Sequence, residues 1–317
     1  MLFLGEVMNN HEIAKSDVAL IDELTETAEQ LLNRHNQHPS DWEPSELIPY
    51  DIGQDYKNKP WSAQDYPLTD GVRSSIFVNL LTEDNLPYYS NTILHYLKDS
   101  VSLNEWSHVW TEEEAKHSTV IREWAHVTRA LDPVELERAR KVQMRKADVP
   151  NPQNLPDLLA YTSFQELATR VAHANTGRAL DSERRGKLLM ATVAGDENRH
   201  HIFYSELAKM ALEIEPDAML VGIRDQLVNF AMPGRGIPGF NRHSLKIERA
   251  RIYDTPKYLN EVVIPTLGKW SINDIEALDQ SGEIAREQIN EHVRMLIAKV
   301  ALIEEKRQVQ DSQAIEH

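Results

Sequence analysis

The stretch Gly195-Asp196-Glu197-Asn198-Arg199-His200 contains the residues that decide the fold of this chain. Glu197 and His200 are three residues apart, and on an α-helix this spacing places both side chains on one face, one turn apart. In helical bundles that bind two metal ions, two helices each provide a Glu and two others each provide a Glu-x-x-His pair. The stretch therefore predicts a bundle helix that carries metal ligands.

A single Glu-x-x-His pair is weak evidence, because the chain contains four of them. The four pairs are Glu105/His108, Glu114/His117, Glu123/His126 and Glu197/His200. A di-metal bundle also needs a lone carboxylate on the helix before each ligand pair. Glu83 lies 31 residues before Glu114 (114 − 83), and Glu166 lies 31 residues before Glu197 (197 − 166). Both ligand positions are thus offset by 83 residues (166 − 83 and 197 − 114), which is the internal repeat that a pseudo-twofold site requires.

The residues that flank the two ligand pairs repeat as well. Glu113 precedes Glu114, and Asp196 precedes Glu197. A metal-bound His needs an acceptor for its other ring N–H. We therefore expect each of these carboxylates to serve the His of the opposite half. The two remaining Glu-x-x-His pairs begin nine residues from Glu114, on the opposite helix face, and are predicted to be surface or packing residues.

The composition limits the class of protein. The chain has 317 residues, a net charge of −16, 12 Gly and no Cys. The absence of Cys excludes disulfides and thiolate metal sites and favours a cytoplasmic location. The negative charge argues against nonspecific nucleic-acid binding. The short apolar start, Met1-Leu2-Phe3-Leu4, is not expected to be a signal peptide, and no run of 18 apolar residues predicts a membrane span.

Helical periodicity predicts an all-α fold, a four-helix bundle with additional flanking helices. We expect one domain over 1–317, with 1–15 and 308–317 flexible. The predicted helices cover about 16–34, 71–98, 103–130, 132–146, 157–178 and 182–213, then a helix to about 231, a loop at 232–239 and further helices ending with about 272–308. Ser16 is expected to cap the first helix, and Pro87 is expected to kink the second.

Two stretches outside the bundle helices carry further expectations. The apolar stripe of the first helix is predicted to contain Val18, Ile21, Leu24 and Leu31. The segment 36–68 is interrupted by five prolines, and we expect it to wrap over the bundle in an ordered way. Its aromatic residues would be costly to leave in water. They are Trp42, Tyr50, Tyr56 and Trp61.

Four motifs, in order along the chain, resemble those of the soluble acyl-ACP desaturases, the ferritin-like di-iron enzymes of plant plastids and actinobacteria. They are Leu81-Thr82-Glu83-Asp84-Asn85-Leu86-Pro87, Trp110-Thr111-Glu112-Glu113-Glu114-Ala115-Lys116-His117, Tyr161-Thr162-Ser163-Phe164-Gln165-Glu166-Leu167-Ala168-Thr169 and Asp196-Glu197-Asn198-Arg199-His200. The resemblance covers roughly 40–240 and is strongest with the actinobacterial branch. Two departures are Ala115-Lys116, where the family often has Asn-Arg, and the additional His201. Neither departure removes a ligand.

The resemblance implies an enzyme that binds two iron ions per chain. The implied ligands are Glu83, Glu114, His117, Glu166, Glu197 and His200. It also implies a homodimer that uses O₂ to insert a cis double bond into a saturated acyl chain. The chain would arrive on acyl carrier protein, and ferredoxin would donate the electrons. Hydrogen removal from an unactivated carbon needs a dry site, so we expect an apolar tunnel past the metals.

Three features carry interpretations that the sequence leaves open. Trp42 matches the tryptophan near the surface end of the family's electron path, which would run from Trp42 through Asp196 to His117. The alternative is that Trp42 is a packing residue. The basic helix 132–146 is a candidate site for the acidic carrier protein, and the alternative is an ordinary charged face. Its candidate contacts are Arg138, Lys141, Arg145 and Lys146. His173, seven residues past Glu166, is expected to support the site or the core rather than to bind metal.

Thr169 is a candidate catalytic residue. It lies three residues after Glu166 and so shares the face of that ligand. A hydroxyl there can donate a hydrogen bond to bound oxygen and pass a proton to it. Leu86 takes the equivalent position in the other half, so the pocket is predicted to be polar on one side only. The alternative is a Thr that bonds back to the carbonyl of Gln165.

Other functions share parts of this pattern. A ferritin uses similar ligands, but this chain is longer than one bundle. A small subunit of ribonucleotide reductase needs a radical site, for which Tyr88, Tyr89 and Tyr161 are candidates. A di-iron hydroxylase or N-oxygenase is a closer alternative, because the same oxidant can insert oxygen. A scaffold without activity fits poorly with a complete set of six ligands.

Overall fold

The computed structural model describes residues 13–146, 149–181, 183–229 and 234–315, and helices are the regular secondary structure within these ranges. The predicted all-α, ferritin-like fold is confirmed. The helices are α1 (Lys15–Asn36), α2 (Pro44–Leu47), α3 (Asp70–Glu83), α4 (Leu86–Leu97), α5 (Val101–Val127), α6 (Pro133–Lys146), α7 (Leu155–Ala179), α8 (Arg184–Ile214), α9 (Pro216–Val228), α10 (Phe240–Arg249), α11 (Thr255–Lys257), α12 (Ile264–Trp270) and α13 (Gln280–Ile315). A 3₁₀ turn, η1 (Tyr50–Ile52), and a π-helical turn, η2 (Tyr258–Val263), complete the order.

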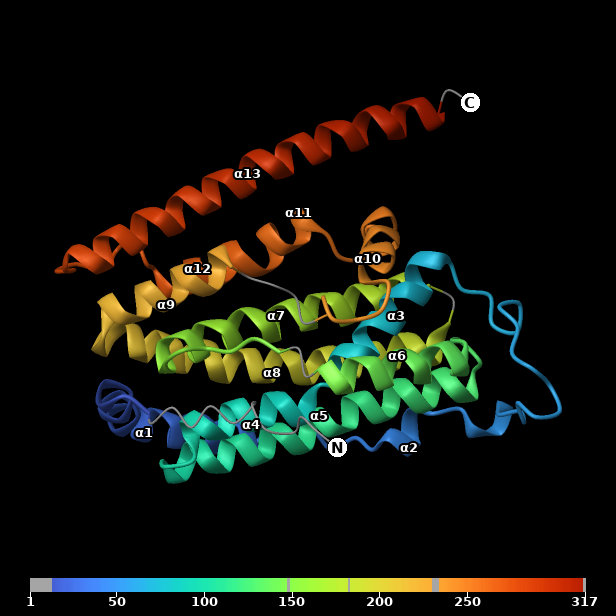
Figure 1. Cartoon of the computed structure of the whole chain (residues 1–317), viewed down its shortest axis with the longest axis horizontal. Coiled ribbons are helices and arrows are strands. Elements are labelled where there is room, and N and C mark those ends of the chain that lie inside the picture. The colour runs from blue at the N-terminus through green and yellow to red at the C-terminus, as the bar shows by residue number, and fades with distance from the viewer. Residues whose placement is uncertain (1–12, 147–148, 182, 230–233, 316–317) are drawn as a thin grey trace, which may run out of the picture.

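The helices form stacked layers (Figure 1). Helices α7 and α8 run side by side in the middle and make the most extensive contact in the molecule. Helices α3, α4 and α5 pack with them to form the bundle, and α9, α12 and α13 lie on the other side. Helix α9 approaches α7 closely at Gly222, where an added Cβ would lie 2.8 Å from the carbonyl carbon of Pro156. Packing of apolar faces, rather than helix propensity, holds such layers together.

Two hydrophobic cores occupy opposite ends of the bundle, and polar ligands lie between them. On α5, Trp106 belongs to one core and Trp124 to the other. On α8, Met190 and Phe203 are divided in the same way. The segments between these residues carry the two Glu-x-x-His pairs singled out by spacing. The cores therefore hold the polar cluster in a dry, rigid position.

The single helix predicted over 71–98 is wrong, because the chain forms two helices there. Helix α3 ends at Glu83 and α4 begins at Leu86. Pro87 lies in the first turn of α4, where its missing N–H is not needed, so it starts a helix instead of kinking one. Asn85 has left the helical conformation, and its carbonyl accepts the N–H of Tyr88. Glu83 is consequently the last residue of its helix.

Several finer expectations also differ from the structure. Helix α1 begins at Lys15 without a side-chain cap, so Ser16 lies inside the first turn. Val18 is 43% exposed, whereas the other predicted stripe residues are buried. The segment 36–68 contacts the bundle through Trp42, Tyr56 and Trp61, but residues 51–55 and 57–60 are exposed, so it covers the bundle only in part. Tyr50 is 54% exposed, and its hydroxyl donates to Glu123 at the surface.

The ends of the chain bear on two further expectations. Helix α13 continues to Ile315, so the predicted helix end near 308 is wrong. Within the expected loop 232–239, residues 232–233 lie outside the described residues, as do 1–12 and 316–317 of the expected flexible ends. In the part of the chain that the structure describes, no helix has the length and apolar character that a membrane crossing needs.

Candidate metal centre

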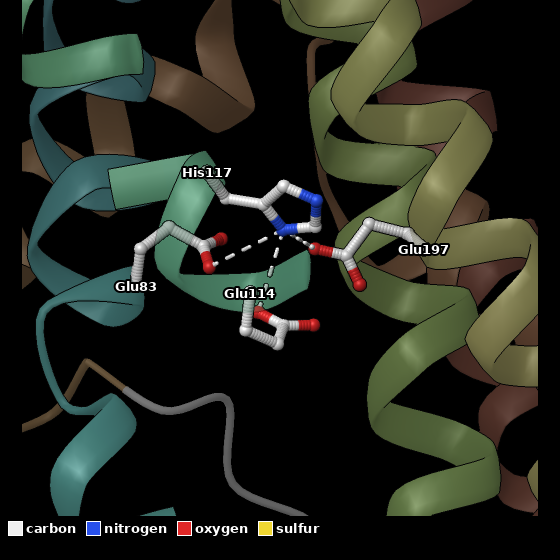
Figure 2. A group of neighbouring side chains, drawn as sticks. All are labelled: Glu83, Glu114, His117 and Glu197. Carbon is white, nitrogen blue, oxygen red and sulfur yellow. Dashed lines mark ion pairs between the residues drawn. The ribbon is translucent and has the colours of Figure 1, made fainter. Parts of the chain in front are cut away.

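The six residues expected as ligands come together from four helices. Two overlapping sets place one ligand-type atom of each residue within 4.8 Å of the others. The first set is Glu83, Glu114, His117 and Glu197, and the second is Glu114, Glu166, Glu197 and His200. Figure 2 shows the first set converging on the His117 ring. Since Glu114 and Glu197 belong to both sets, the six residues would suit two metal ions, with these two carboxylates available to either ion.

Each histidine presents one ring nitrogen to this cluster. Nδ1 of His117 lies 3.4 Å from an oxygen of Glu114 and 3.5 Å from one of Glu197. Nδ1 of His200 lies 3.0 Å from Glu114 and 3.6 Å from Glu166. Within the described part of the chain, neither Nδ1 atom has a hydrogen-bond partner. Such buried, unpartnered nitrogens fit a metal ion as the missing partner.

The other ring nitrogen of each histidine contacts a carboxylate from the opposite half. Nε2 of His200 lies 2.7 Å from Glu113, and Nε2 of His117 lies 3.3 Å from Asp196. The contacts between halves that the flanking residues suggested are therefore present. An acceptor on Nε2 places the ring proton there and leaves Nδ1 free to bind metal.

The electrostatics of the cluster also suit cations. Burial is the main reason why the pKa of Glu83 and the pKa of Glu166 lie well above the usual range. Burial acts to lower the pKa of His117, but the charge of Glu114 and the hydrogen bond to Asp196 outweigh it, so this pKa is raised. The pKa of His200 is raised against burial too, mainly by Glu113. The pKa of Glu114, by contrast, is lowered, chiefly by His117 acting against burial, so this carboxylate stays ionised beside the two imidazoles. Protons on Glu83, Glu166 and the two imidazoles thus offset the negative charge of the cluster, and metal cations can replace them.

The end of α1 and the segment after it reach Glu113 and Asp196, the two carboxylates behind the ligand histidines. The indole N–H of Trp42 donates to Asp196 at 2.8 Å, and the ring stacks on His117 with centroids 6.4 Å apart. His35 contacts Glu113 at 3.0 Å. The guanidinium of Arg199 lies between the two carboxylates, 2.8 Å from Glu113 and 3.3 Å from Asp196. The side chain of Arg199 therefore links the two carboxylates that contact His117 and His200.

The hydroxyl of Thr169 lies beside a proposed ligand and also within reach of the carbonyls of its own helix. Its Oγ1 lies 2.8 Å from Oε2 of Glu197, 3.1 Å from the carbonyl of Gln165 and 3.0 Å from that of Glu166. Its single proton can serve one acceptor at a time. Thr169 and Leu86 both line a small cavity of about 10 Å³ beside the ligands. The hydroxyl therefore lies where a reacting group would have to fit.

Each outermost carboxylate is held by a buried N–H donor. Nε2 of His173 lies 2.9 Å from Oε1 of Glu83, so His173 supports a ligand, as expected. Burial lowers the pKa of His173 to about 4, which keeps the ring neutral. Glu166 accepts a hydrogen bond of 3.1 Å from the indole N–H of Trp110.

The sequence reasoning assigned no role to some residues of this network. Trp110 could have been found, because it lies four residues before Glu114 on the same helix face. His35 and Asn79 carry no such signal, since only the tertiary structure brings them to the site.

Residues expected to lie outside the site are found elsewhere. Glu105 and His108 are exposed, and His126 bonds to the carbonyl of Arg122 in its own helix. The predicted carrier-protein contacts on α6, here called the α6 cations, are exposed. They are Arg138, Lys141, Arg145 and Lys146. Arg140 of the same helix is instead paired with Asp84 and Glu137.

Comparisons with known proteins agree with this geometry. A family model described as fatty acid desaturase matches residues 16–317. The chain belongs to the fatty acid desaturase family. The resemblance carried by the four sequence motifs is thereby confirmed.

Relatives of this desaturase chain come from bacteria and plants. DesA1 of Mycobacterium tuberculosis is 34% identical over 285 residues, which cover 86% of this chain and 84% of that protein. Its name gives it, provisionally, as an acyl-[acyl-carrier-protein] desaturase. The chloroplastic stearoyl-[acyl-carrier-protein] 9-desaturase of Spinacia oleracea is 25% identical over 331 residues, which cover 97% of this chain and 81% of that protein.

A solved structure shows the same fold. It is the X-ray structure of DesA2 from Mycobacterium tuberculosis H37Rv, whose title gives it, also provisionally, as an acyl-ACP desaturase. The two structures align with a TM-score of 0.68 at 22% identity, over 83% of this chain and 99% of the DesA2 chain. At this identity the likeness supports the fold of the desaturase bundle and not a particular substrate.

Proposed function

We propose that this protein is an acyl-[acyl-carrier-protein] desaturase that uses O₂ to insert a cis double bond into a saturated fatty acyl chain. The observation that carries the proposal is the pair of overlapping ligand sets, buried between two hydrophobic cores in a chain of the desaturase family. Its relatives' names give the substrate class, an acyl chain on acyl carrier protein.

We propose that the centre holds two iron ions. Glu83 and His117 would bind one ion, Glu166 and His200 the other, and Glu114 and Glu197 both. Carboxylates with imidazoles suit iron better than softer metals, and no thiolate is available because the chain has no Cys. Two iron ions bound here supply the reductive activation of O₂ that hydrogen removal from an unactivated carbon needs.

Electrons would enter along Trp42, Asp196 and His117. Support comes from the hydrogen bond between the indole and Asp196 and from the stacking of the indole on His117. Trp42 is half-buried, so its outer edge can meet a reductant. Ferredoxin is the proposed donor, and a homodimer is the proposed assembly; both rest on the family resemblance.

The acyl chain would enter a cavity of about 330 Å³ between α3, α7, α10 and η2. Asn79 lines this cavity and contacts His173, which contacts Glu83 beside the small cavity at the ligands. The large cavity therefore approaches the proposed metals. Apolar side chains such as Ile247 and Phe240 contribute to its wall, as an acyl chain requires.

The α6 cations are the proposed docking site for the acidic carrier protein. Nζ of Lys146 donates to the carbonyl of Gly236 at 2.9 Å, which ties the end of α6 to the turn that contains Arg235. Arg235 lines the large cavity. A carrier protein on α6 would therefore hold its acyl chain near the cavity. The overall charge of −16 opposes an acidic partner, so docking would depend on this local patch and weaken with salt.

The test is product analysis. Iron-loaded protein is incubated with saturated acyl carrier protein thioesters, a reducing system and O₂, and the released fatty acids are analysed by mass spectrometry. We expect products two mass units below the substrate, formed only when O₂ and reductant are both present. Oxygen-containing products without any desaturated product would favour the hydroxylase alternative and overturn the proposal.

A further inference from the structure

The floor of the large cavity is polar, although a plain acyl chain would need an apolar one. The floor consists of the buried residues that α3 and α7 contribute to the lining, which are Ser75, Asn79 and Ala172. They are 2%, 7% and 7% exposed, whereas Arg235, on another part of the lining, is exposed. The floor is therefore the inner end of the cavity, and two of its three side chains are polar.

Contacts beneath the floor fix which way the amide of Asn79 faces. The hydroxyl of Thr176 donates to the carbonyl of Ala172 at 2.7 Å, so its oxygen must accept from its other neighbours. The amide nitrogen of Asn79 lies 3.3 Å from this oxygen and 3.4 Å from Nδ1 of His173. Both hydrogens of that nitrogen therefore have partners. The group that Asn79 can offer to a bound molecule is its acceptor Oδ1, which has no hydrogen-bond partner within the described residues.

Ser75 offers an acceptor as well. Its Oγ lies 2.7 Å from Oγ1 of Thr176. Because the hydrogen of Thr176 is directed to Ala172, Ser75 must be the donor in this contact. The oxygen of Ser75 then keeps lone pairs for a bound molecule but no hydrogen. The polar part of the floor thus consists of two acceptors and no donor.

An acyl chain that ends in a methyl group does not match this floor. A methyl group placed against Asn79 gives no hydrogen to Oδ1, and a buried acceptor without a partner costs free energy. A hydroxyl at the end of the chain supplies the missing donor. An ammonium group would also donate, but it carries a charge, and no carboxylate belongs to the floor to pair with it. The floor therefore suits a hydroxyl best.

We propose that the large cavity binds an acyl chain with a hydroxyl group at its far end, and that this hydroxyl donates a hydrogen bond to Oδ1 of Asn79, with Oγ of Ser75 as a second acceptor. The inference rests on the proposed function, because it takes the ligand of the cavity to be an acyl chain on acyl carrier protein. It narrows that class to hydroxyacyl chains. Asn79 and Ser75 are then specificity-determining residues, and apolar lining residues such as Val78 and Ile247 contact the chain between its ends.

The test measures binding to the full-length protein by calorimetry, without reductant, so that no turnover occurs. The probes are acyl carrier protein thioesters of a saturated chain, of the same chain with a terminal hydroxyl and of the same chain with a terminal methoxy group, over a series of chain lengths. At the lengths that reach the floor, the hydroxylated chain should bind about 10-fold more tightly than the plain one, the effect of one hydrogen bond to a buried acceptor. The methoxy chain has an oxygen but no hydrogen to donate and should bind no more tightly than the plain chain.

Variants of α3 assign the preference to the floor. Asn79→Leu replaces the acceptor by an apolar side chain of similar size and should abolish the preference for the hydroxylated chain while retaining binding of the plain one. Ser75→Ala removes the second acceptor and should lower the preference; it decides the matter if Asn79→Leu fails to fold. Ser74→Ala is the matched control, because Ser74 is the neighbouring residue and is also buried but contacts His243 at 3.1 Å and does not line the cavity. It should keep the parental preference.

Three results would overturn the inference: equal affinity of the parent for the plain and hydroxylated chains at every length, a methoxy chain that binds as tightly as the hydroxylated one, or a full preference in both Asn79→Leu and Ser75→Ala. The expected preference in a protein that forms no desaturated product from either chain would instead refute the proposed function and leave recognition of the hydroxyl standing. A protein that binds none of the thioesters would overturn both.

Discussion

We predict that Glu113→Gln lowers the affinity of the protein for one metal ion and leaves its affinity for the other unchanged. Glu113 accepts contacts from three groups: Oε2 faces His200 at 2.7 Å, and Oε1 faces His35 at 3.0 Å and Arg199 at 2.8 Å. A glutamine has a single acceptor oxygen. If that oxygen faces His35 and Arg199, the amide N–H groups face His200. Nε2 of His200 must then become an acceptor, and its proton moves to Nδ1, the atom that would bind metal.

The size of the effect follows from this exchange. Loss of a hydrogen-bond partner behind a ligand usually costs about 10- to 100-fold in metal affinity. At about 1.36 kcal/mol for each factor of ten, the ion that Glu166 and His200 would bind should lose about 1.4–2.7 kcal/mol of binding free energy. The affinity for the ion that Glu83 and His117 would bind should not change, because Nε2 of His117 contacts Asp196 rather than Glu113. Asp196→Asn should therefore show the reverse pattern.

The assay is a calorimetric and spectroscopic titration of metal-free protein with Co²⁺. The parent should bind two ions, and Glu113→Gln should bind one with parental affinity and one more weakly. Glu112→Gln is the matched control, because the side chain of Glu112 is 67% exposed and pairs only with Lys116 in the described structure. Equal weakening of both ions in Glu113→Gln, or none, would refute the reasoning from the two ligand sets.

The remaining predictions concern pH, proton supply and docking. Because the pKa values of His117 and His200 are raised in the metal-free protein, both rings hold protons that a metal ion must displace. The affinity for Co²⁺ should therefore rise with pH and fall on acidification. Binding of Co²⁺ should release protons, which a titration in weak buffer would detect. Thr169→Val should retain both ions but lower the rate of desaturation by about 100-fold, the lower end of the effect of losing a proton-transfer group. It should also release more peroxide for each O₂ consumed. A variant with the parental rate and coupling would show that Thr169 has no catalytic role. Replacing Lys141 and Arg145 by Glu should raise the KM for the carrier-bound substrate and remove its dependence on salt at unchanged metal content, whereas an unchanged KM would leave the α6 cations as an ordinary charged face.

Regular spacing made much of the centre predictable from the sequence. The distance of 31 residues between lone and paired ligands, repeated after 83 residues, selects the same six side chains that the structure gathers. Helix periodicity alone brings Glu197 and His200 to one face. The exchange of carboxylates between halves follows from the same repeat, because Glu113 and Asp196 take equivalent positions.

Other features depend on contacts that no local pattern encodes. His35 reaches Glu113 from a helix 78 residues away in sequence, and Asn79 meets His173 across 94 residues. Sequence alone does not distinguish the break between α3 and α4 from a kink, because a proline inside a periodic stretch is equally compatible with the first turn of a new helix. The large cavity is likewise set by how α10 and η2 pack against the bundle.

The crossed arrangement of Glu113 with His200 and of Asp196 with His117 has a consequence for the origin of the chain. A lone helical hairpin from either half would have a histidine with no partner for its outer nitrogen, and so no well-oriented ligand. Two identical hairpins associated about a twofold axis would satisfy both histidines at once. An ancestral gene encoding one hairpin could thus have formed a working centre as a dimer before duplication and fusion joined its copies. The repeat makes Lys116 the counterpart of Arg199 (199 − 83), but Lys116 pairs with Glu112 while Arg199 touches both carboxylates, so the two halves of this chain are no longer equivalent behind their histidines.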